Sequence, residues 1–441
     1  MTMKSDGGFV SASPEYLEHS IYNIRAGTAR VWEFSGWRRE SLSWKNSCYI
    51  HAGLSGRGSQ IIFRGPEAKR FLASICVNGF ENFSVGAAKH AIMCIDNGLI
   101  ASHGVLQRLA DDTFRLFCAA LWAPYQYSKT GFDVEQVIED RYLFQIAGPN
   151  SLPLLEKLSG ENLSDIRFLR SRDIRIAGMD MQIMRVGMAG TLAYELHGPM
   201  SEAHAVYQIV FEAGEEFGIE RLGWRTYGVN HIEGGFPQQT WTFLGASDAD
   251  PGYQPFMNSL RGAAGISASI SGSVDHSDMR ARWRSITEVG WEKSVNLDHD
   301  FIGREAVAAE LAAPKRTIVT LEWNAEDVTD VFASQVREDG EPYSAFEMPV
   351  TPAFKHMVGH ADHVTIGGRR VGVSSSVAYS YYYRKFISHC TIDRDAAEPG
   401  TDVIVHWGEA GRRIKEIRAR TARFPYLNIS RNADLDLKRS A

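Results

Sequence analysis

Residues 223–236 hold the densest group of side chains able to do chemistry. Within this segment Tyr227 and His231 are four residues apart, so a helix would place both on one face. A phenol hydroxyl and an imidazole can exchange protons with a bound molecule, and the glycines of the segment allow a ligand to approach the backbone closely. The alternative is a helix end in which the histidine is satisfied in the core and the tyrosine only packs.

A second segment, residues 184–199, places the carboxylate of Glu195 inside a strand-like apolar run. If Glu195 points inward, its burial is costly unless N–H donors meet the carboxylate. A ligand with an amidine-like edge supplies such donors in pairs. The alternative is an edge strand on which Glu195 faces solvent.

Other reactive side chains are scattered. His51 and His103 lie in or beside strand-like runs, but no histidines have the spacing of a metal site, so no metal is predicted. The sequence contains no nucleophile elbow, Walker loop or dinucleotide fingerprint, which removes the commonest hydrolase, NTPase and dehydrogenase classes. The five cysteines fit no zinc, redox or disulfide spacing and are expected to be thiols in a reducing compartment.

Composition limits the possible classes of protein. The chain has 441 residues, of which 44% are hydrophobic and 23% charged, so an ordinary folded protein with more than one core is expected. A net charge of -6 argues against nucleic acid as a partner. The sequence lacks an apolar run long enough to cross a membrane and a hydrophobic leader, so a cytoplasmic protein is predicted. It carries no signal for an oligomeric state.

The elements that must position these side chains follow a repeated order. A strand at residues 60–64, a Gly-Pro turn and a helix at 67–74 are followed by a strand at 142–147, a second Gly-Pro turn and a helix at 151–158. This repetition predicts a duplicated α+β module. Residues 201–218 predict one long amphipathic helix that ends at a glycine.

The rest of the chain has a different character. Residues 246–282 are rich in Gly, Ser, Asp and Ala without a sustained period, so a loop-rich excursion near a binding site is expected. Later residues alternate as strands do, at 316–323, 369–374 and 402–407. We therefore predict an α+β fold in which residues 1–310 form a core of two modules and residues 311–441 form a mostly β, barrel-like domain.

Two ordered motifs add a family resemblance. The run from Arg185 to Gly190, followed by Glu195, and the run from Phe301 to Arg304 look like elements of the glycine-cleavage T-protein (aminomethyltransferase) superfamily. The chain resembles this superfamily over nearly its whole length. The resemblance implies a folate-binding core with tetrahydrofolate as cofactor. It also implies cofactor-binding roles for Glu195, Gln145 and Arg185.

Within that superfamily the chain is most similar to tetrahydrofolate-dependent O-demethylases of methoxybenzoates. Arg225 and Tyr227, together with the runs 391–393 and 405–408, carry this likeness. It implies transfer of the methyl group of a small methoxylated aromatic acid to N5 of tetrahydrofolate. Tyr227 would be the general acid, with His231 as a second catalytic candidate. The ordinary pKa of tyrosine, near ~10, matches that of a phenol leaving group.

The sequence also departs from the family pattern. The arginine that reads the substrate carboxylate is replaced near Cys118, the active-site histidine falls in the loop 53–58, and a catalytic aspartate is missing from 97–103. A rebuilt ring pocket is therefore expected. The residues predicted to bind the substrate are His51, His103, Phe236 and Trp241. The alternatives are a one-carbon transferase for an S-methyl or N-methyl donor and a non-catalytic folate-binding protein.

Overall fold

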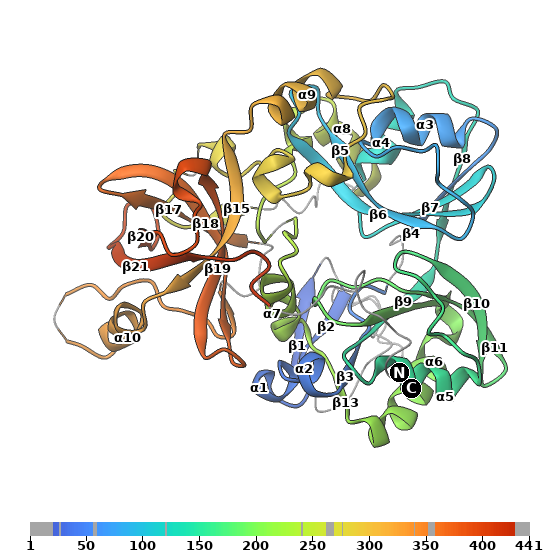
Figure 1. Cartoon of the computed structure of the whole chain (residues 1–441), viewed down its shortest axis with the longest axis horizontal. Coiled ribbons are helices and arrows are strands. Elements are labelled where there is room, and N and C mark those ends of the chain that lie inside the picture. Colours follow the sequence, from blue (N-terminus) through green and yellow to red (C-terminus); the bar gives the residue numbers. More distant parts are fainter. Residues whose placement is uncertain are drawn as a thin grey trace.

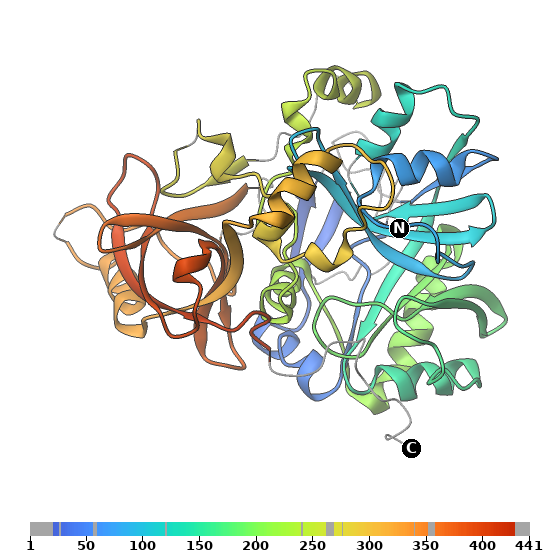
Figure 2. The same ribbon diagram turned by 45° about the horizontal axis from the view of Figure 1, so that its top comes forward.

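The computed structural model describes residues 21–25, 28–55, 60–119, 121–239, 241–261, 269–275, 277–338, 340–351 and 358–427. These residues form two α+β modules, one above the other in Figure 1, with a β-barrel beside them. Helix α7 (Trp224–Gly234) lies between the barrel and the modules in both ribbon views (Figures 1 and 2). No helix within these ranges is long and apolar enough to cross a membrane.

The first module is built on a five-stranded sheet in the order β5-β6-β7-β4-β8. Its strands are β4 (Gln60–Arg64), β5 (Ala88–Cys94), β6 (Ile100–Ala110), β7 (Thr113–Phe117) and β8 (Glu135–Glu139). Its helices are α3 (Ala68–Ile75), α4 (Trp122–Ser128), α8 (Tyr253–Arg261) and α9 (Arg304–Ala312). Alternate apolar residues of the sheet, such as Phe63 and Leu106, pack with Phe71 of α3 into one core.

The second module has a six-stranded sheet in the order β10-β11-β12-β9-β3-β13. Its strands are β3 (Cys48–His51), β9 (Arg141–Ala147), β10 (Ser171–Ile176), β11 (Met179–Met184), β12 (Ala193–Pro199) and β13 (Ile219–Arg221). Helices α5 (Ser151–Ser159) and α6 (Ala203–Gly214) cover one face, where Phe144, Tyr194 and Val206 meet. Because β3 precedes β4 in sequence and pairs with β9, which follows β8, the five-stranded sheet with α3 and α4 is inserted between two neighbouring strands. Helices α8 and α9 join the first module from later in the chain.

The two modules share one local design. β4 and β9 each end at a glycine with a left-handed φ, +133° at Gly65 and +129° at Gly148, before α3 and α5 begin. A Cβ atom at Gly65 would lie 2.7 Å from the carbonyl oxygen of Asp133, and one at Gly148 would lie 2.4 Å from that of Ser47. Glycine is therefore required at both turns. The predicted strand, Gly-Pro turn and helix units are confirmed.

The predicted C-terminal barrel is also present. Strands β15 (Arg316–Trp323), β17 (Val358–Ile366), β18 (Arg369–Ser380), β19 (Lys385–Asp393), β20 (Asp402–Trp407) and β21 (Lys415–Ala422) close on themselves through antiparallel pairs. β14 (Ser269–Ser271), β16 (Val350–Thr351) and helix α10 (Ala325–Ser334) add to its outside. β14 pairs with β17, so a segment from before residue 310 contributes to this sheet.

Two predictions for the helices have different outcomes. The predicted helix 201–218 is α6 with a short 3-10 turn at each end, and it stops at Gly218, whose φ is +69°. The expectation of an irregular segment at 246–282 is wrong for α8. Tyr253 of α8 packs at 5.6 Å from Trp122 and at 5.4 Å from Tyr125 of α4. Tertiary packing of aromatic rings thus decides a helix that local composition does not predict.

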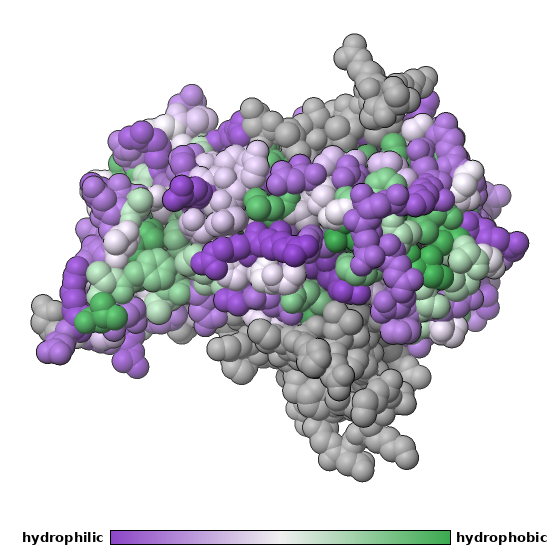
Figure 3. All heavy atoms as spheres, turned by 90° about the horizontal axis from the view of Figure 1, so that it is seen from below, coloured by the Kyte–Doolittle hydropathy of each residue, from purple (hydrophilic) through white to green (hydrophobic). Residues whose placement is uncertain are grey.

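The remaining elements lie on the α7 side of the molecule. They are β1 (Ile21–Arg25), β2 (Thr28–Glu33), α1 (Trp37–Glu40) and α2 (Ser43–Asn46). Of these, β2, α1 and α2 contact α7, and β1 pairs with β2. Among the described residues visible in Figure 3, hydrophilic side chains alternate with separate hydrophobic areas.

Glu233 links the C-terminal end of α7 to its neighbours by an ion pair and hydrogen bonds. Its Oε2 atom lies 2.6 Å from Nζ of Lys45 and 3.2 Å from Nε1 of Trp44 in α2, and its Oε1 accepts from the Ser380 hydroxyl of β18 at 2.5 Å. The side chains of Lys45 and Glu233 are 5% and 1% exposed. The pair therefore joins α7, the second module's edge and the barrel inside the protein.

Removing this carboxylate is expected to destabilise the fold strongly. Glu233→Ala leaves the Lys45 ammonium buried without its counter-charge, which costs roughly 3–5 kcal/mol of unfolding free energy. Urea denaturation followed by tryptophan fluorescence measures the change. Glu135→Ala, which breaks the exposed pair with Arg64, is the matched control and should cost less than ~1 kcal/mol. Equal losses in the two variants would contradict this account of the buried pair.

Candidate active site

Tyr227 lies at the centre of a cluster of aromatic rings on α7. The ring of His51 stacks on it at 4.2 Å with an interplanar angle of 12°, and His231 meets it edge-on at 4.5 Å. Trp224 and Trp241 pack against the same ring at 5.1 and 5.8 Å. Tyr227 is 3% exposed. These contacts fix the ring in one orientation, and they bring Tyr227 and His231 together on one helix face.

A buried carboxylate fixes the start of α7, one turn before Tyr227. Oε2 of Glu40 accepts from the backbone N–H of Gly223 at 3.0 Å and from the hydroxyl of Thr226 at 3.1 Å. The first N–H groups of a helix have no acceptor within the helix, and this carboxylate accepts a hydrogen bond at that end instead. Burial raises the pKa of Glu40 above its ordinary value, against the lowering effect of these hydrogen bonds.

Three polar residues form a row across the six-stranded sheet. His51 of β3 pairs with Gln145 of β9, which pairs on its other side with Glu195 of β12. Directly paired residues share a face of a sheet, so the three side chains lie opposite the core that contains Phe144 and Tyr194. β12 is an interior strand and Glu195 is 1% exposed, which excludes the alternative of an exposed edge-strand glutamate.

Hydrogen bonds join this row to Tyr227. Glu195 accepts from Nε2 of Gln145 at 3.2 Å and from Nε2 of His197 at 3.1 Å. An ionised carboxylate can only accept, so His197 carries its proton on Nε2. The side chain of Gln145 also hydrogen-bonds to Tyr227. One amide thus connects the Tyr227 hydroxyl to the Glu195 carboxylate.

The environment keeps Tyr227 protonated. Burial raises the pKa of Tyr227 well above its ordinary value, and Cys118, Tyr49 and Glu195 raise it further. The sequence suggested a tyrosine with the acidity of an ordinary phenol, and the structure makes it a weaker acid. A weaker acid is suited to donating a hydrogen bond to an oxygen on which negative charge develops, without surrendering its proton fully. Tyr227 is therefore a donor with its proton in place at neutral pH.

His231, unlike Tyr227, presents a hydrogen-bond acceptor. Its Nδ1 lies 3.0 Å from the carbonyl oxygen of Tyr227, which can only accept, so the ring proton is on Nδ1. Its Nε2 is buried and has no partner in the part of the chain that the structure describes. Burial lowers the pKa of His231 to about 4. The ring is therefore neutral at pH 7 and offers a lone pair.

Acid is expected to destabilise the protein through His231. The unfolded ring takes up a proton near pH ~6.5, whereas the folded ring does so near pH 4. The unfolded state therefore binds more protons between these values, and stability falls as pH is lowered through this window, by roughly 2 kcal/mol at pH ~5. Urea midpoints measured from pH 7 to pH 5 should show a shallower fall for His231→Gln. His204→Gln, at an exposed position of α6, should keep the wild-type slope.

The polar row leaves acceptors for a ligand. Oδ1 of Asn230 is buried and unpaired within the described ranges, while its Nδ2 donates to the Tyr49 hydroxyl at 3.1 Å. The Glu195 carboxylate can accept more than the two hydrogen bonds it has. These acceptors fit a flat heterocycle with neighbouring N–H donors, such as the pterin edge of a folate. Glu195 and Gln145 both belong to this row, and their predicted cofactor-binding role stays a prediction.

A cavity of roughly 200 Å³ opens beside Tyr227. Its lining residues are Leu54, His90, His103, Gly104, Val105, Cys118, Met188, Trp224, Tyr227, Phe236, Gln238, Gln239 and Trp241. Three of the predicted substrate residues, His103, Phe236 and Trp241, are among them, and His51 lies against Tyr227. Aromatic walls with a few polar groups are typical of a site for a small aromatic molecule.

Arg185 lies apart from this arrangement. It is 4% exposed, and its Nη1 donates to the carbonyl oxygen of Ile166 at 3.2 Å. Among the described residues its guanidinium does not line the cavity. Its predicted cofactor contact therefore stays a prediction. In the loop where the family's histidine was expected, residues 56–58 lie outside the described residues.

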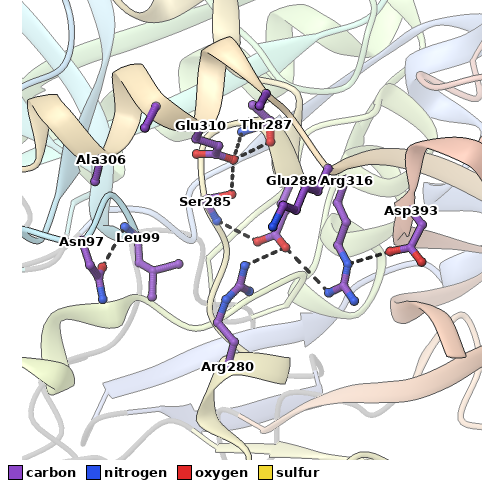
Figure 4. A pocket seen from close by; sticks show the side chains of 13 residues that line it. Asn97, Leu99, Arg280, Ser285, Thr287, Glu288, Ala306, Glu310, Arg316 and Asp393 are labelled. Atoms are coloured by element: carbon purple, nitrogen blue, oxygen red, sulfur yellow. Dashed lines mark hydrogen bonds and ion pairs between the residues drawn. The ribbon is translucent and has the colours of Figure 1, made fainter.

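A larger cavity, of roughly 750 Å³, lies between α9 and the barrel (Figure 4). Most of its charged side chains are paired with one another. Nη2 of Arg280 donates to Glu288 at 2.8 Å, and Nε of Arg316 donates to Asp393 at 3.0 Å. Glu310 accepts from the hydroxyls of Ser285 and Thr287. Since these pairs hold the segment 280–288 against α9 and the barrel, we assign this cavity a structural role.

Sequence reasoning missed several residues of the aromatic cavity. They are Leu54, His90, Gly104, Val105, Met188, Gln238 and Gln239. The sequence did carry a signal for His90. Its period-two spacing from Ile92, like that of His103 from Val105, places each pair on one face of a strand. The two Gln residues had no signal, since they follow α7 in an irregular segment. Within the described ranges, no group of three or more His, Cys, Asp or Glu side chains could hold a metal ion.

A sequence profile described as the GCVT N-terminal domain matches residues 26–264, more than half of the chain. The chain belongs to the GCVT family. As a member of this family of T-proteins, it is a folate-dependent one-carbon transferase, and its cofactor is tetrahydrofolate. The buried acceptor row described above is consistent with that cofactor.

Two relatives match this GCVT protein over most of its length. The sesamin methylene transferase of Sinomonas sp. (strain No.22) is 37% identical over 417 residues, which cover 92% of each chain. The syringate O-demethylase of Sphingobium sp. (strain NBRC 103272 / SYK-6) is 30% identical over 430 residues, which cover 92% of this chain and 91% of the relative.

The fold is shared with a solved structure. The glycine cleavage system aminomethyltransferase T from Bartonella henselae superposes with a TM-score of 0.66, covering 93% of this GCVT protein and 95% of the other chain. The two sequences are 15% identical, so the likeness concerns the fold alone. It confirms the predicted fold class, an α+β core with a C-terminal barrel.

Proposed function

We propose that this enzyme transfers the methyl group of a methoxylated aromatic acid to N5 of tetrahydrofolate, giving a phenol and 5-methyltetrahydrofolate. The observation that carries the proposal is the position of Tyr227. Its ring forms part of an aromatic cavity, while its hydroxyl is connected through Gln145 to the buried carboxylate of Glu195. A substrate site and a cofactor site thus meet at one hydroxyl group.

The residues of the cavity have separate tasks in this reaction. Phe236 and Trp241 hold the substrate ring by aromatic contact and exclude water. Tyr227 donates a hydrogen bond to the ether oxygen, where negative charge develops as the bond to the methyl carbon breaks. Its raised pKa keeps this hydrogen-bond donor protonated at neutral pH. His231, with a lone pair on Nε2, keeps a neutral acceptor beside Tyr227.

Glu195 and Gln145 would hold the pterin edge of tetrahydrofolate. The cofactor supplies the nucleophilic nitrogen that takes up the methyl group. The protein's part is orientation, since alignment of two reactants can lower the activation free energy by roughly 7–11 kcal/mol. Both side chains belong to interior strands and are 1% and 3% exposed, so their positions are fixed before ligands bind.

A second candidate is transfer of a methylene group from an uncharged methylenedioxy arene. The described residues that line the cavity include no lysine or arginine, so they offer a carboxylate no counter-charge. The relative with 37% identity is named for methylene transfer from sesamin. S-methyl and N-methyl donors are the alternative substrates carried over from the sequence.

Anaerobic incubation of the full-length protein with tetrahydrofolate and a panel of donors tests the proposal. The panel contains syringate, vanillate and 3-O-methylgallate with trideuteromethyl labels, 1,2-methylenedioxybenzene, and an S-methyl and an N-methyl compound. Mass spectrometry should find the label in 5-methyltetrahydrofolate together with the matching phenol. Methylenetetrahydrofolate from the methylenedioxy compound alone would favour the second candidate. No folate product from any donor, with folate binding intact, would contradict both.

A further inference from the structure

The imidazoles of His90 and His103 form a pair on the cavity wall. The proposed reaction assigns no role to this pair. His90 Nε2 and His103 Nδ1 are 3.2 Å apart, and the rings meet edge-on at 5.1 Å. They lie on β5 and β6, on the sheet face that also carries Val105 and Phe117. That face packs against the second module, and both rings line the cavity between the modules.

The protons of this pair have one possible order. The backbone N–H of Gln239 donates to Nε2 of His103 at 3.3 Å, so that nitrogen holds a lone pair. Burial lowers the pKa of His103 well below its ordinary value, so the ring is neutral and its proton is on Nδ1. Nδ1 therefore donates to Nε2 of His90. Burial lowers the pKa of His90 to about 4, so His90 is neutral too and carries its proton on Nδ1.

The series of hydrogen bonds therefore ends at the Nδ1–H group of His90, a residue that lines the cavity. His90 is partly buried and lines the cavity, and no described residue accepts a hydrogen bond from its Nδ1. Trp291 packs edge-on at 4.5 Å and Phe236 at 5.5 Å, so the ring cannot turn freely. The result is a fixed, uncharged donor among aromatic walls.

We propose that His90 is a specificity-determining residue whose Nδ1–H binds a second, uncharged oxygen substituent on the aromatic ring of the substrate. A neutral donor suits a hydroxyl or ether oxygen, because it satisfies that oxygen without burying an unpaired charge. This inference rests on the proposed function, since it assumes that the cavity holds the ring of the methyl or methylene donor.

Binding of two small phenols tests the inference without turnover. 1,2-Dihydroxybenzene has a second ring oxygen and phenol does not, and neither has a methyl group to transfer. Isothermal titration should show that the wild-type protein binds 1,2-dihydroxybenzene roughly three- to tenfold more tightly. His90→Asn keeps an N–H near the place of Nδ1 and should keep the preference. His90→Gln moves its amide towards the place of Nε2 and should lose it.

A second measurement needs no variant. Nitrogen NMR of the protein with labelled histidine should find both His90 and His103 with the proton on Nδ1. A proton on Nε2 of His90, or equal wild-type affinity for the two phenols, would overturn the inference. A retained preference for 1,2-dihydroxybenzene in a protein that demethylates no donor would overturn the proposed function and leave the role of His90 in place.

Discussion

Tyr227→Phe is expected to lower kcat by roughly 10²- to 10⁴-fold, with little change in the affinity for tetrahydrofolate. The substitution removes one hydroxyl and keeps the ring that stacks on His51 at 4.2 Å and packs on Trp241 at 5.8 Å. The cavity thus keeps its shape while the leaving oxygen loses its donor. Single-turnover formation of 5-methyltetrahydrofolate measures the chemical step directly.

Tyr142→Phe is the matched control. Tyr142 is fully buried in the second module, and its hydroxyl makes only a weak contact of 3.7 Å with the sulfur of Met181. This variant should keep wild-type turnover. If Tyr227→Phe kept full turnover as well, the leaving oxygen would have to receive its hydrogen bond from another group, and the role assigned to Tyr227 would be wrong.

Glu195→Gln is expected to weaken tetrahydrofolate binding by roughly 10- to 100-fold, because hydrogen bonds to a charged acceptor contribute about 1.5–3 kcal/mol each. The glutamine has nearly the same shape, but it turns one acceptor into a donor. That donor would face Nε2 of Gln145 or Nε2 of His197, both of which donate to the carboxylate at 3.2 and 3.1 Å. Equilibrium binding of tetrahydrofolate by fluorescence quenching measures the loss.

The readout for Glu195 separates its role from that of Tyr227. Glu195→Gln should change the dissociation constant of the cofactor, whereas Tyr227→Phe should change the rate. Glu212→Gln, at an exposed position of α6, is the control for a change of charge alone and should bind the cofactor normally. An unchanged dissociation constant for Glu195→Gln would remove this residue from the cofactor site.

Local signals in the sequence predicted most of the architecture. Residues 316–323 and 402–407 match β15 and β20 because period-two alternation and turn residues mark a strand within its own segment. The Gly-Pro turns at Gly65 and Gly148 were predictable for the same reason, since their conformation is a property of a few neighbouring residues. Helix α8 was missed because aromatic rings of α4, distant in sequence, hold it in place.

The site was predictable only where a motif or a helical spacing marked it. Tyr227 and His231 follow from their spacing on one helix. The burial of Glu195 depends on strand order, because β12 lies between β11 and β9. A local sequence pattern does not predict strand order. His90 depends on register across β5 and β6, and its proton order depends on the backbone of Gln239. Such contacts between distant segments are fixed only by the folded chain.

The insertion of the first module's sheet between β3 and β9 has a consequence for synthesis on the ribosome. All five strands of the first sheet have been made once residue 139 has been added, whereas the six-stranded sheet must wait for β13 at residues 219–221. The pairing of β3 with β9 also closes a loop that contains the whole first sheet, and such long-range pairs form late. The emerging chain is therefore expected to order its inserted part first, while β3 waits unpaired for its neighbours.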